Sequence, residues 1–407
     1  MKKIVGGVTA PKGFEAAAAE ANIKYKNRTD MALIYSEAPC KTAGVFTKNI
    51  VKAAPVKWDQ KIVKEEQEVN AVIINSGIAN AGTGEEGMQY CVETAKKAAN
   101  ILGISQQAVL VGSTGVIGMQ LPIEKIKQGI EMLVKEKAAT IEAGEFAAKA
   151  IMTTDTCKKE IAISFEIEGK KVTVGGMAKG SGMIHPDMCT MLAFITTDAA
   201  ITQAALTQAL KEDVEDTYNM ISVDGDTSTN DTVLVLANGQ AENKLIDVQT
   251  EEYKAFAEAL HTVNETLAKM VAGDGEGATA LFEVKVVGAK SKEQAVKISK
   301  SVVASSLTKT AIAGHDANWG RILCAMGYAG VAFDPEIVDL FFESSAGKIQ
   351  IAKNGVAADY SEEEATKILS QSEVTALIEL KQGEEQAVAW GCDLTHGYID
   401  INADYRS

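Results

Sequence analysis

The sequence predicts a mixed α/β fold, because runs typical of buried strands alternate with amphipathic helical runs along the chain. The runs typical of strands are short, apolar and rich in Val, Ile, Leu and Phe: 71–74, 109–112, 232–236, 281–287 and 338–342. Ala-rich helices are expected around 88–102 and 137–151. Another helix is indicated by apolar residues that recur at spacings of three and four: Phe256, Leu260, Val263, Leu267 and Met270.

The composition is that of an ordinary globular protein. Of its 407 residues, 46% are hydrophobic and 23% are charged, which is enough to bury a sizeable core. No stretch approaches the roughly eighteen consecutive apolar residues of a membrane span. The six cysteines are scattered without a C-x-x-C pair, which favours neither a disulfide framework nor a zinc site. We therefore expect a cytoplasmic protein with no metal and no membrane partner.

The charge balance limits the class of ligand. A formal net charge of -15 argues against nucleic-acid binding. The same charge means that the protein as a whole does not attract an anionic substrate. Any site for a carboxylate must therefore be positive locally.

Short Gly-rich loops are the most unusual feature of the chain. Gly112–Gly115, Lys179–Gly182 and Gly273–Gly277 are three of them. Loops of this kind bring backbone N–H groups close to a ligand. The polar run Asp224–Asp231 imitates a calcium-binding loop but lacks the required glycine and glutamate, and we interpret it as a hydrogen-bonded turn.

The Lys179–Gly182 loop leads through Pro186 to Cys189 and Thr190, which open an apolar run. A threonine hydroxyl is a poor nucleophile unless a base lies within hydrogen-bond reach, and the α-amine of an N-terminal threonine is such a base. An internal Thr190 has no free amine, so this chemistry requires cleavage of the Cys189–Thr190 bond. By itself, a Cys-Thr pair is more often an ordinary part of a strand.

The run from Ala178 to Phe194 resembles the ornithine acetyltransferase family, the glutamate N-acetyltransferases of arginine biosynthesis, whose signature is K-G-S-G-M-I followed by P-N-M-A-T-M-L. The resemblance extends from the opening Gly6–Phe14 to the closing Ile401–Ser407. Asp187 and Cys189 replace the usual asparagine and alanine beside the scissile bond. In that family the bond before the threonine is broken autocatalytically.

The resemblance implies roles for individual residues. Thr190 is the implied nucleophile, and Thr114 with Gly115 forms the implied oxyanion hole. The implied substrate contacts are Thr153, Lys179, Thr190, Glu276, Asn402 and Ser407. Lys179 is expected to neutralise a substrate carboxylate, and Glu276 to contact the amino end of an ornithine chain. We expect the run 398–401 to fix the C-terminus in a sheet, and we assign Asn75, Asn80, His315 and Asp316 no role beyond loop structure.

The resemblance also implies the architecture and the reaction. Two stacked β-sheets lie between helical layers, and fragments 1–189 and 190–407 are intertwined in one folded body, with two copies of each fragment in a heterotetramer. N-acetylornithine acetylates Thr190, ornithine leaves, and glutamate takes the acetyl group. No cofactor is needed, although acetyl-CoA is open as a second acetyl donor.

Two alternatives remain at this stage. A self-processing amidohydrolase or aminopeptidase of the same architecture would resolve the acyl-enzyme with water and release acetate. A non-catalytic amino-acid-binding protein would use the Gly-rich loops to hold its ligand and would remain one intact polypeptide.

Overall fold

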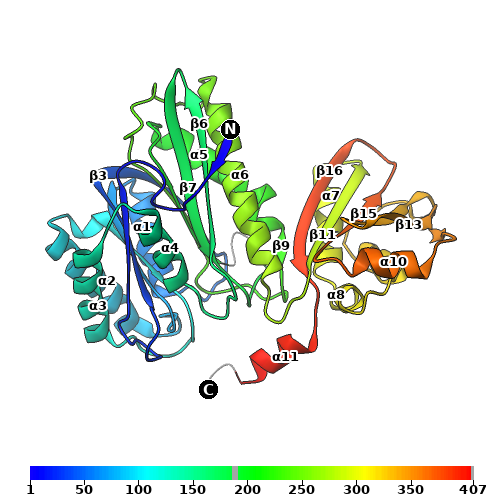
Figure 1. Cartoon of the computed structure of the whole chain (residues 1–407), viewed down its shortest axis with the longest axis horizontal. Helices are drawn as coiled ribbons and strands as arrows, with labels where there is room; N and C mark the ends of the chain where they lie inside the picture. Colours follow the sequence, from blue (N-terminus) through cyan, green and yellow to red (C-terminus); the bar gives the residue numbers. More distant parts are fainter. Residues whose placement is uncertain (186–190, 405–407) are drawn as a thin grey trace. The chain divides into compact units, whose positions relative to one another are not determined.

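The computed structural model describes residues 1–185 and 191–404, and the chain within them forms two compact units. Unit 1 comprises the described residues of 1–180, 187–218 and 227–267, and unit 2 comprises those of 181–186, 219–226 and 268–407. Each unit has its own β-sheet (Figure 1). The expected division into fragments 1–189 and 190–407 falls outside the described residues and stays a prediction.

In the described residues, unit 1 is built on a nine-stranded sheet with the order β1-β6-β7-β8-β10-β3-β4-β5, in which β2 also pairs with β3. Its strands are β1 (Lys2–Ile4), β2 (Phe14–Ala19), β3 (Met31–Phe46), β4 (Val69–Asn75), β5 (Val109–Ser113), β6 (Lys159–Ile167), β7 (Lys170–Lys179), β8 (Leu192–Thr197) and β10 (Thr232–Ala237).

The long strand β3 folds this sheet back on itself. Its first half pairs with β2 and β4, its second half pairs with β10, and the register shifts between Tyr35 and Cys40. Side chains of β4 and β5 share one buried cluster with side chains of β7, β8 and β10. At the centre, a β-carbon on Gly112 of β5 would lie 3.1 Å from the ring of Phe194 on β8. The two halves of the sheet are therefore stacked face to face.

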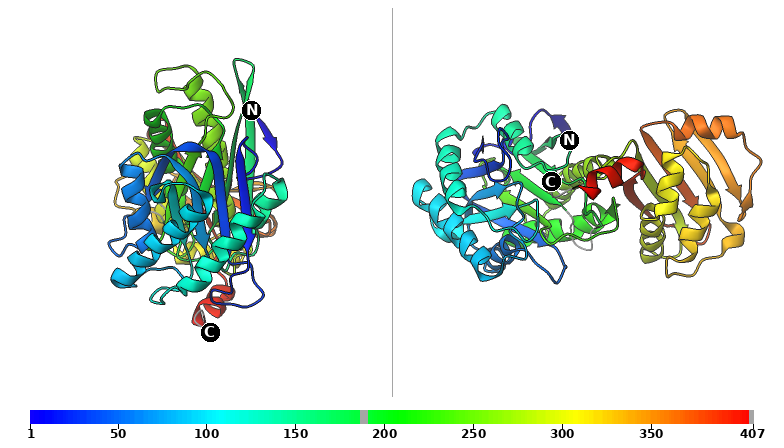
Figure 2. Two further views of the ribbon diagram at one scale, coloured as in Figure 1. Left: turned by 90° about the vertical axis from the view of Figure 1, so that its left-hand side faces the viewer. Right: turned by 90° about the horizontal axis from the view of Figure 1, so that it is seen from below.

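Helices cover the outer faces of these stacked halves. They are α1 (Ala54–Lys64), α2 (Gly84–Leu102), α3 (Ile123–Glu136), α4 (Ile141–Ala150), α5 (Gln203–Asp216) and α6 (Glu252–Gly273), with short 3-10 turns at Gln106–Ala108 and Tyr218–Met220. Helix α4 also contributes side chains to the buried cluster between the halves. The apolar faces of α2 and α3 pack against β3, β4 and β5, and they lie in front of the strands in the left view of Figure 2. On the other half, Val263 and Leu267 of α6 lie against Gly176 of β7. The expected four layers are confirmed, and all four lie within unit 1.

Unit 2 contains, in its described residues, a seven-stranded sheet with the order β14-β13-β12-β15-β11-β16-β9. Its strands are β9 (Ile221–Ser222), β11 (Leu281–Ala289), β12 (Asp339–Ser344), β13 (Gly347–Lys353), β14 (Val356–Ala357), β15 (Glu373–Glu379) and β16 (Glu385–Cys392). Its helices are α7 (Lys292–Val303), α8 (Ser306–Ala313), α9 (Trp319–Gly327), α10 (Glu362–Leu369) and α11 (His396–Ala403), with a 3-10 turn at Pro335–Ile337. Helix α7 packs against β11 and β16.

Most of the expected elements are confirmed. All five predicted strand runs lie in strands, apart from Val338, which directly precedes β12. The predicted apolar face of α6 is buried at Phe256, Leu260, Val263 and Leu267, while Met270 is half-buried. The Ala-rich helix expected at 137–151 begins later, at Ile141, because the Thr140 side chain caps it by accepting a hydrogen bond from Ala143 N.

The expectation that residues 398–401 pin the C-terminus in a sheet is wrong. These residues belong to helix α11, and no side chain of that helix is buried. The hydroxyl of Thr395 accepts a hydrogen bond from Gly397 N at 3.1 Å and caps the helix. A four-residue run of apolar and polar residues does not distinguish a strand from one turn of helix, and here the cap decides the outcome.

Among all described helices, none is long and apolar enough to cross a membrane.

Candidate active site

The loop after β5 carries the two residues of the expected oxyanion hole. The main-chain N–H groups on either side of Gly115 are already hydrogen-bonded. Thr114 N donates to Asn75 O at 3.0 Å, and Val116 N donates to Gly77 O at 3.1 Å. Within residues 1–185 and 191–404, the Gly115 N–H and the half-buried Thr114 hydroxyl have no acceptor. Two neighbouring donors are therefore available to an external oxygen, and an oxyanion hole needs such donors.

Glycine is required at position 115. Its φ of +128° lies where residues with a side chain are strained, and a β-carbon there would lie 2.2 Å from the carbonyl carbon of Gly77. This close approach keeps the loop against the segment that follows β4. Glycine at this position therefore permits a close approach that a side chain would prevent.

The side chains of two asparagines, Asn75 and Asn230, hydrogen-bond to Ser113 at the start of this loop. This contact was not predicted from the sequence for either residue. Asn75 Oδ1 accepts a hydrogen bond from Ser113 Oγ at 2.6 Å. Asn230 Nδ2 donates to Ser113 O at 2.8 Å and to Ala79 O at 2.6 Å. All three side chains are buried, so these bonds are shielded from water and fix the main chain that leads into Thr114.

The sheet register brings Lys179 to the end of the sheet at which β8 begins. Lys179, the last residue of β7, pairs with Leu192, the first residue of β8, and Leu192 pairs in turn with Thr232 at the start of β10. Thr232 N donates to Met191 O at 2.9 Å. Asn230, which donates to Ser113 O in the loop after β5, lies two residues before Thr232. Thr190 directly precedes Met191 in the chain; like Cys189, it lies outside the described residues.

Asp155 connects Lys179 with Thr153, another expected substrate contact in unit 1. Asp155 Oδ2 accepts a hydrogen bond from Thr153 N at 2.9 Å, and the Lys179 ammonium lies 3.9 Å from the same oxygen. Asp155 Oδ1 accepts hydrogen bonds from Gly180 N and from Lys159 Nζ, each at 2.7 Å. Thr153 is also held from the other side, because Arg28 donates to its carbonyl oxygen at 3.0 Å.

The carboxyl group of Asp155 is ionised despite its burial. Burial by itself would raise its pKa, but the positive charges of Lys179 and Lys159 and the hydrogen bonds from Lys159 and Thr153 outweigh it, and the pKa of Asp155 is lowered below its ordinary value. Sequence reasoning missed Asp155 and Lys159. Neither stands in a Gly-rich loop, and one sequence does not separate a buried lysine from a surface one.

In unit 2, Glu276 and Asn402 lie in contact. Glu276 is buried, and its Oε2 accepts a hydrogen bond from Asn402 Nδ2 at 2.7 Å. Its main-chain N–H donates to Ser181 O at 2.9 Å. A β-carbon on Gly182 would lie 2.3 Å from Glu276 Oε2, so the glycine of the Lys179–Gly182 loop leaves room for this carboxylate. The structure thus pairs two of the expected substrate contacts; Ser407 lies outside the described residues.

Within the run Asp224–Asp231, Asp226 N donates to Asp224 Oδ1 at 3.3 Å and Asn230 N donates to Ser228 Oγ at 3.2 Å, as expected of a hydrogen-bonded turn. Asp224 accepts hydrogen bonds from the main-chain N–H groups of Met183 at 2.6 Å and Ile184 at 2.8 Å. Asp224 therefore orders the second half of the Gly-rich loop. In the described part of the chain, no group of three or more His, Cys, Asp and Glu side chains could hold a metal ion.

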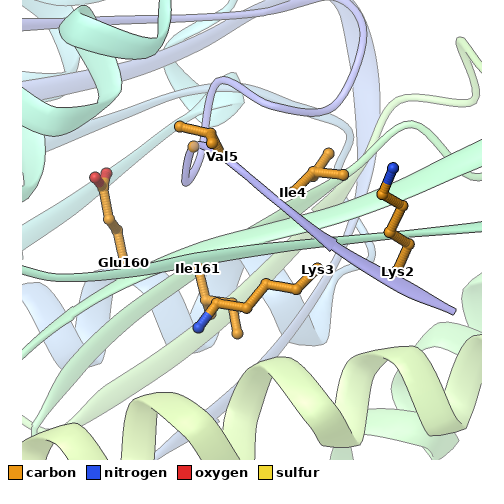
Figure 3. A pocket seen from close by; sticks show the side chains of 7 residues that line it. Lys2, Lys3, Ile4, Val5, Glu160 and Ile161 are labelled. Atoms are coloured by element: carbon orange, nitrogen blue, oxygen red, sulfur yellow. The ribbon is translucent and has the colours of Figure 1, made fainter.

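A surface hollow of about 530 Å³ lies elsewhere on unit 1 (Figure 3). It is lined by Lys2, Lys3, Ile4, Val5, Gly6, Glu160 and Ile161. None of the expected catalytic or substrate-binding residues contributes to it. We therefore place the candidate active site at the ends of β5, β7 and β10 and not in this hollow.

Comparison with known proteins adds a family relationship. The model of the ArgJ family matches residues 15–407. The arginine biosynthesis bifunctional protein ArgJ of Thermotoga neapolitana is 52% identical over 98% of this chain and 99% of its own length. The protein of the same name from Caldanaerobacter subterraneus subsp. tengcongensis is 49% identical over the full length of both chains. Among solved structures, the crystal structure of arginine biosynthesis bifunctional protein argJ from Bacillus halodurans matches this chain with a TM-score of 0.51 and 46% sequence identity. The match covers 53% of this chain and 99% of the crystallised chain.

Proposed function

Since this chain belongs to the ArgJ family, we propose that it is a glutamate N-acetyltransferase of arginine biosynthesis, which transfers an acetyl group from N-acetylornithine to glutamate. The observation that carries the proposal is the pair of available donors at Thr114 and Gly115. Through Asn230, these donors are tied to the end of the sheet at which β8 begins. Acyl transfer requires such donors, because charge develops on the carbonyl oxygen in the tetrahedral intermediate.

In the proposed mechanism, Thr190 is the nucleophile and its own α-amine is the base. The amine has an ordinary pKa of about 7.7 to 8.0, so a useful neutral fraction exists at physiological pH. The Thr190 hydroxyl attacks the acetyl carbonyl of N-acetylornithine, the oxyanion is held by Thr114 and Gly115, and ornithine leaves. Glutamate then attacks the acetyl-Thr190 ester, so the two amino acids react in turn.

The proposed mechanism requires self-cleavage between Cys189 and Thr190. One comparison supports it: the crystallised Bacillus halodurans chain is matched over 99% of its length yet covers only 53% of this chain. The crystallised chain is therefore about half as long as this one. A fragment of that length is expected if the relative is cleaved near the middle of its sequence. The curated relatives, by contrast, match this chain from end to end.

The substrate contacts follow the chemistry of the groups. Lys179 neutralises the carboxylate that both substrates carry, and Thr153 lies beside it on the same Asp155. Glu276, oriented by Asn402, is suited to the amino end of the ornithine chain. Ser407 completes this proposed set of contacts.

Three further features belong to the proposal. The relatives are named bifunctional, so we propose that acetyl-CoA also serves as an acetyl donor. We propose a heterotetramer of two copies of each fragment. The free thiols of Cys40, Cys91, Cys157, Cys324 and Cys392 fit a reducing cytoplasm.

The test is incubation of the purified protein with N-acetylornithine and glutamate. We expect two fragments on a denaturing gel, with the second beginning at Thr190, and stoichiometric N-acetylglutamate and ornithine. Thr190→Ala should remain uncut and inactive, and Thr190→Ser should retain part of both activities. Free acetate in place of N-acetylglutamate would indicate the amidohydrolase, and an uncut chain that binds amino acids without turnover would indicate the binding protein.

A further inference from the structure

Met183, which precedes the proposed scissile bond in the chain, has an unusual main-chain conformation. Its φ of +56° lies in the left-handed region, which residues with a side chain rarely adopt. Its side chain is 41% exposed, so burial of that side chain does not explain the conformation. Strained residues of this kind persist where the surrounding structure fixes them, and they cluster at functional sites. The contacts that fix Met183 are therefore candidates for a functional role.

The carboxylate of Asp224 binds the main chain at Met183. Its Oδ2 accepts a hydrogen bond from Met183 N at 2.6 Å, and its Oδ1 accepts one from Ile184 N at 2.8 Å. Successive N–H groups beside a left-handed residue form a concavity that binds an anion, and here the anion is a side chain of the same unit. Val223 N also donates to Ile184 O at 2.7 Å. Both main-chain polar groups of Ile184 are thus bound by Val223 and Asp224.

Two further donors orient the carboxylate of Asp224. The hydroxyl of Tyr398, on α11, donates to Oδ2 at 3.2 Å, and Asp226 N donates to Oδ1 at 3.3 Å. Burial and the negative charge of Asp224 raise the pKa of Tyr398, so the hydroxyl keeps its proton and remains a donor. Each carboxylate oxygen therefore accepts two hydrogen bonds, and the orientation of Asp224 is fixed.

The reaction that depends on the chain after Ile184 is the proposed self-cleavage. In that step the Thr190 hydroxyl oxygen bonds to the Cys189 carbonyl carbon, the C–N bond between the two residues breaks, and the hydroxyl proton passes to the departing amine. Water then hydrolyses the ester, which leaves a carboxylic acid on Cys189 and restores the Thr190 hydroxyl. The attack is intramolecular, so its rate depends on how well the chain holds the reacting groups in position. Fixing the main chain up to Ile184 reduces the number of conformations open to the residues that follow.

We propose that Asp224 is a positioning residue for self-cleavage: it holds the main chain of Met183 and Ile184, and so restricts the segment that leads into the scissile bond. The inference rests on the proposed function, in which cleavage frees the Thr190 amine. Asp224 acts through the main chain that it binds and not on the reacting atoms.

The test is the cleavage rate of the full-length precursor, labelled in a short pulse of cell-free translation and followed on a denaturing gel. Asparagine has nearly the shape of aspartate but offers one oxygen and one NH2 group to the two N–H donors. Asp224→Asn should therefore cleave on the order of tenfold more slowly than wild type, at a temperature at which circular dichroism shows both chains folded. Asp224→Glu keeps both carboxylate oxygens and should cleave faster than Asp224→Asn.

The matched control is Asp226→Asn, which makes the same change of charge in the same turn. Asp226 is exposed, and within the described residues it is Asp224, not Asp226, whose carboxylate accepts from Met183 and Ile184. The control should cleave at the wild-type rate. Tyr398→Phe removes a hydroxyl group alone and should slow cleavage several-fold, less than Asp224→Asn does, because the carboxylate still accepts both N–H groups.

Two results would overturn the inference. One is a folded Asp224→Asn chain that cleaves at the wild-type rate, and the other is an asparagine variant that cleaves faster than the glutamate variant, which would show that side-chain shape matters and the second acceptor oxygen does not. If Asp224→Asn does not fold, Tyr398→Phe decides: a several-fold slower rate supports the inference, and the wild-type rate contradicts it. A wild-type precursor that stays whole would instead refute the proposed self-cleavage itself, so the two failures are distinguishable.

Discussion

The Thr114 hydroxyl lies on a loop whose main chain is fixed by Asn75, Gly77 and Asn230. The Thr114→Ala variant should therefore lose one oxyanion donor without moving the other. Loss of one such donor costs about 2.7 to 4 kcal/mol of transition-state stabilisation, so kcat should fall about 10²- to 10³-fold. Single-turnover formation of the acetyl-enzyme measures this step directly.

Thr114→Ser is the matched control, because it keeps the hydroxyl and removes only a methyl group. It should retain most of the activity, and both variants should bind N-acetylornithine with similar affinity. If the alanine variant formed acetyl-enzyme at the wild-type rate, the Thr114 hydroxyl would have no part in the oxyanion hole.

At this scale, the sequence predicts residues that belong to recognisable motifs and misses those that act through distant contacts. Thr114, Gly115 and Lys179 stand in Gly-rich loops that can be identified from the sequence. Asp155 and Asn230 are ordinary polar residues in the sequence. Their importance depends on hydrogen bonds to Gly180 and Ser113, residues 25 and 117 positions away in the chain.

At the scale of elements, apolar runs predicted the buried strands well, because a strand buried on both faces needs little beyond a short apolar run. Helix α11 was mispredicted because its short sequence contains no decisive periodicity. The pairing of β3 with different strands along its two halves could not be predicted. A strand that pairs with β4 along one half and with β10 along the other depends on partners that lie 23 and 186 residues after it in the chain.

The contact between helices α5 and α6 contains a titratable pair. His261 Nδ1 of α6 lies 2.7 Å from Asp213 Oδ1 of α5, and this hydrogen bond raises the pKa of His261, with Glu265 and Asp216 adding to the effect. Because the pKa of His261 is higher in the folded state than in the unfolded state, protonation of His261 stabilises the folded protein. This stabilisation is complete below the unfolded-state pKa of about 6.5, and it is lost as pH rises through the folded-state pKa.

We therefore expect the His261→Gln variant to have a lower Tm than wild type at pH 5.5 and a nearly equal Tm at pH 8.5. Thermal unfolding at both pH values measures the difference. In an Asp213→Asn background, the same substitution should shift Tm with a smaller dependence on pH, because only Glu265 and Asp216 then raise the pKa of His261. A Tm difference that grows with rising pH would contradict the assignment of the proton to this pair.

At the scale of the whole molecule, the net charge of -15 opposes the approach of one substrate more than the other. Near pH 7, glutamate carries one net negative charge, whereas N-acetylornithine carries one charge of each sign and is neutral overall. The field of the whole protein acts over a Debye length of about 30 Å at 0.01 M salt and about 10 Å at 0.1 M. In the proposed function, the buried Lys179 acts on the substrate carboxylate at contact distance, where screening is weaker.

Added salt should therefore weaken the long-range repulsion of glutamate more than it weakens the local attraction by Lys179. We expect kcat/KM for glutamate to rise roughly twofold between 0.01 and 0.1 M NaCl relative to kcat/KM for N-acetylornithine. In a ping-pong reaction, each kcat/KM reports its own half-reaction, so the ratio isolates the effect of substrate charge. Competition by chloride for the carboxylate site affects both substrates and cancels in the ratio. A ratio that falls with salt would show that the field at the site is attractive over long range, and that positive groups beyond Lys179 guide glutamate to it.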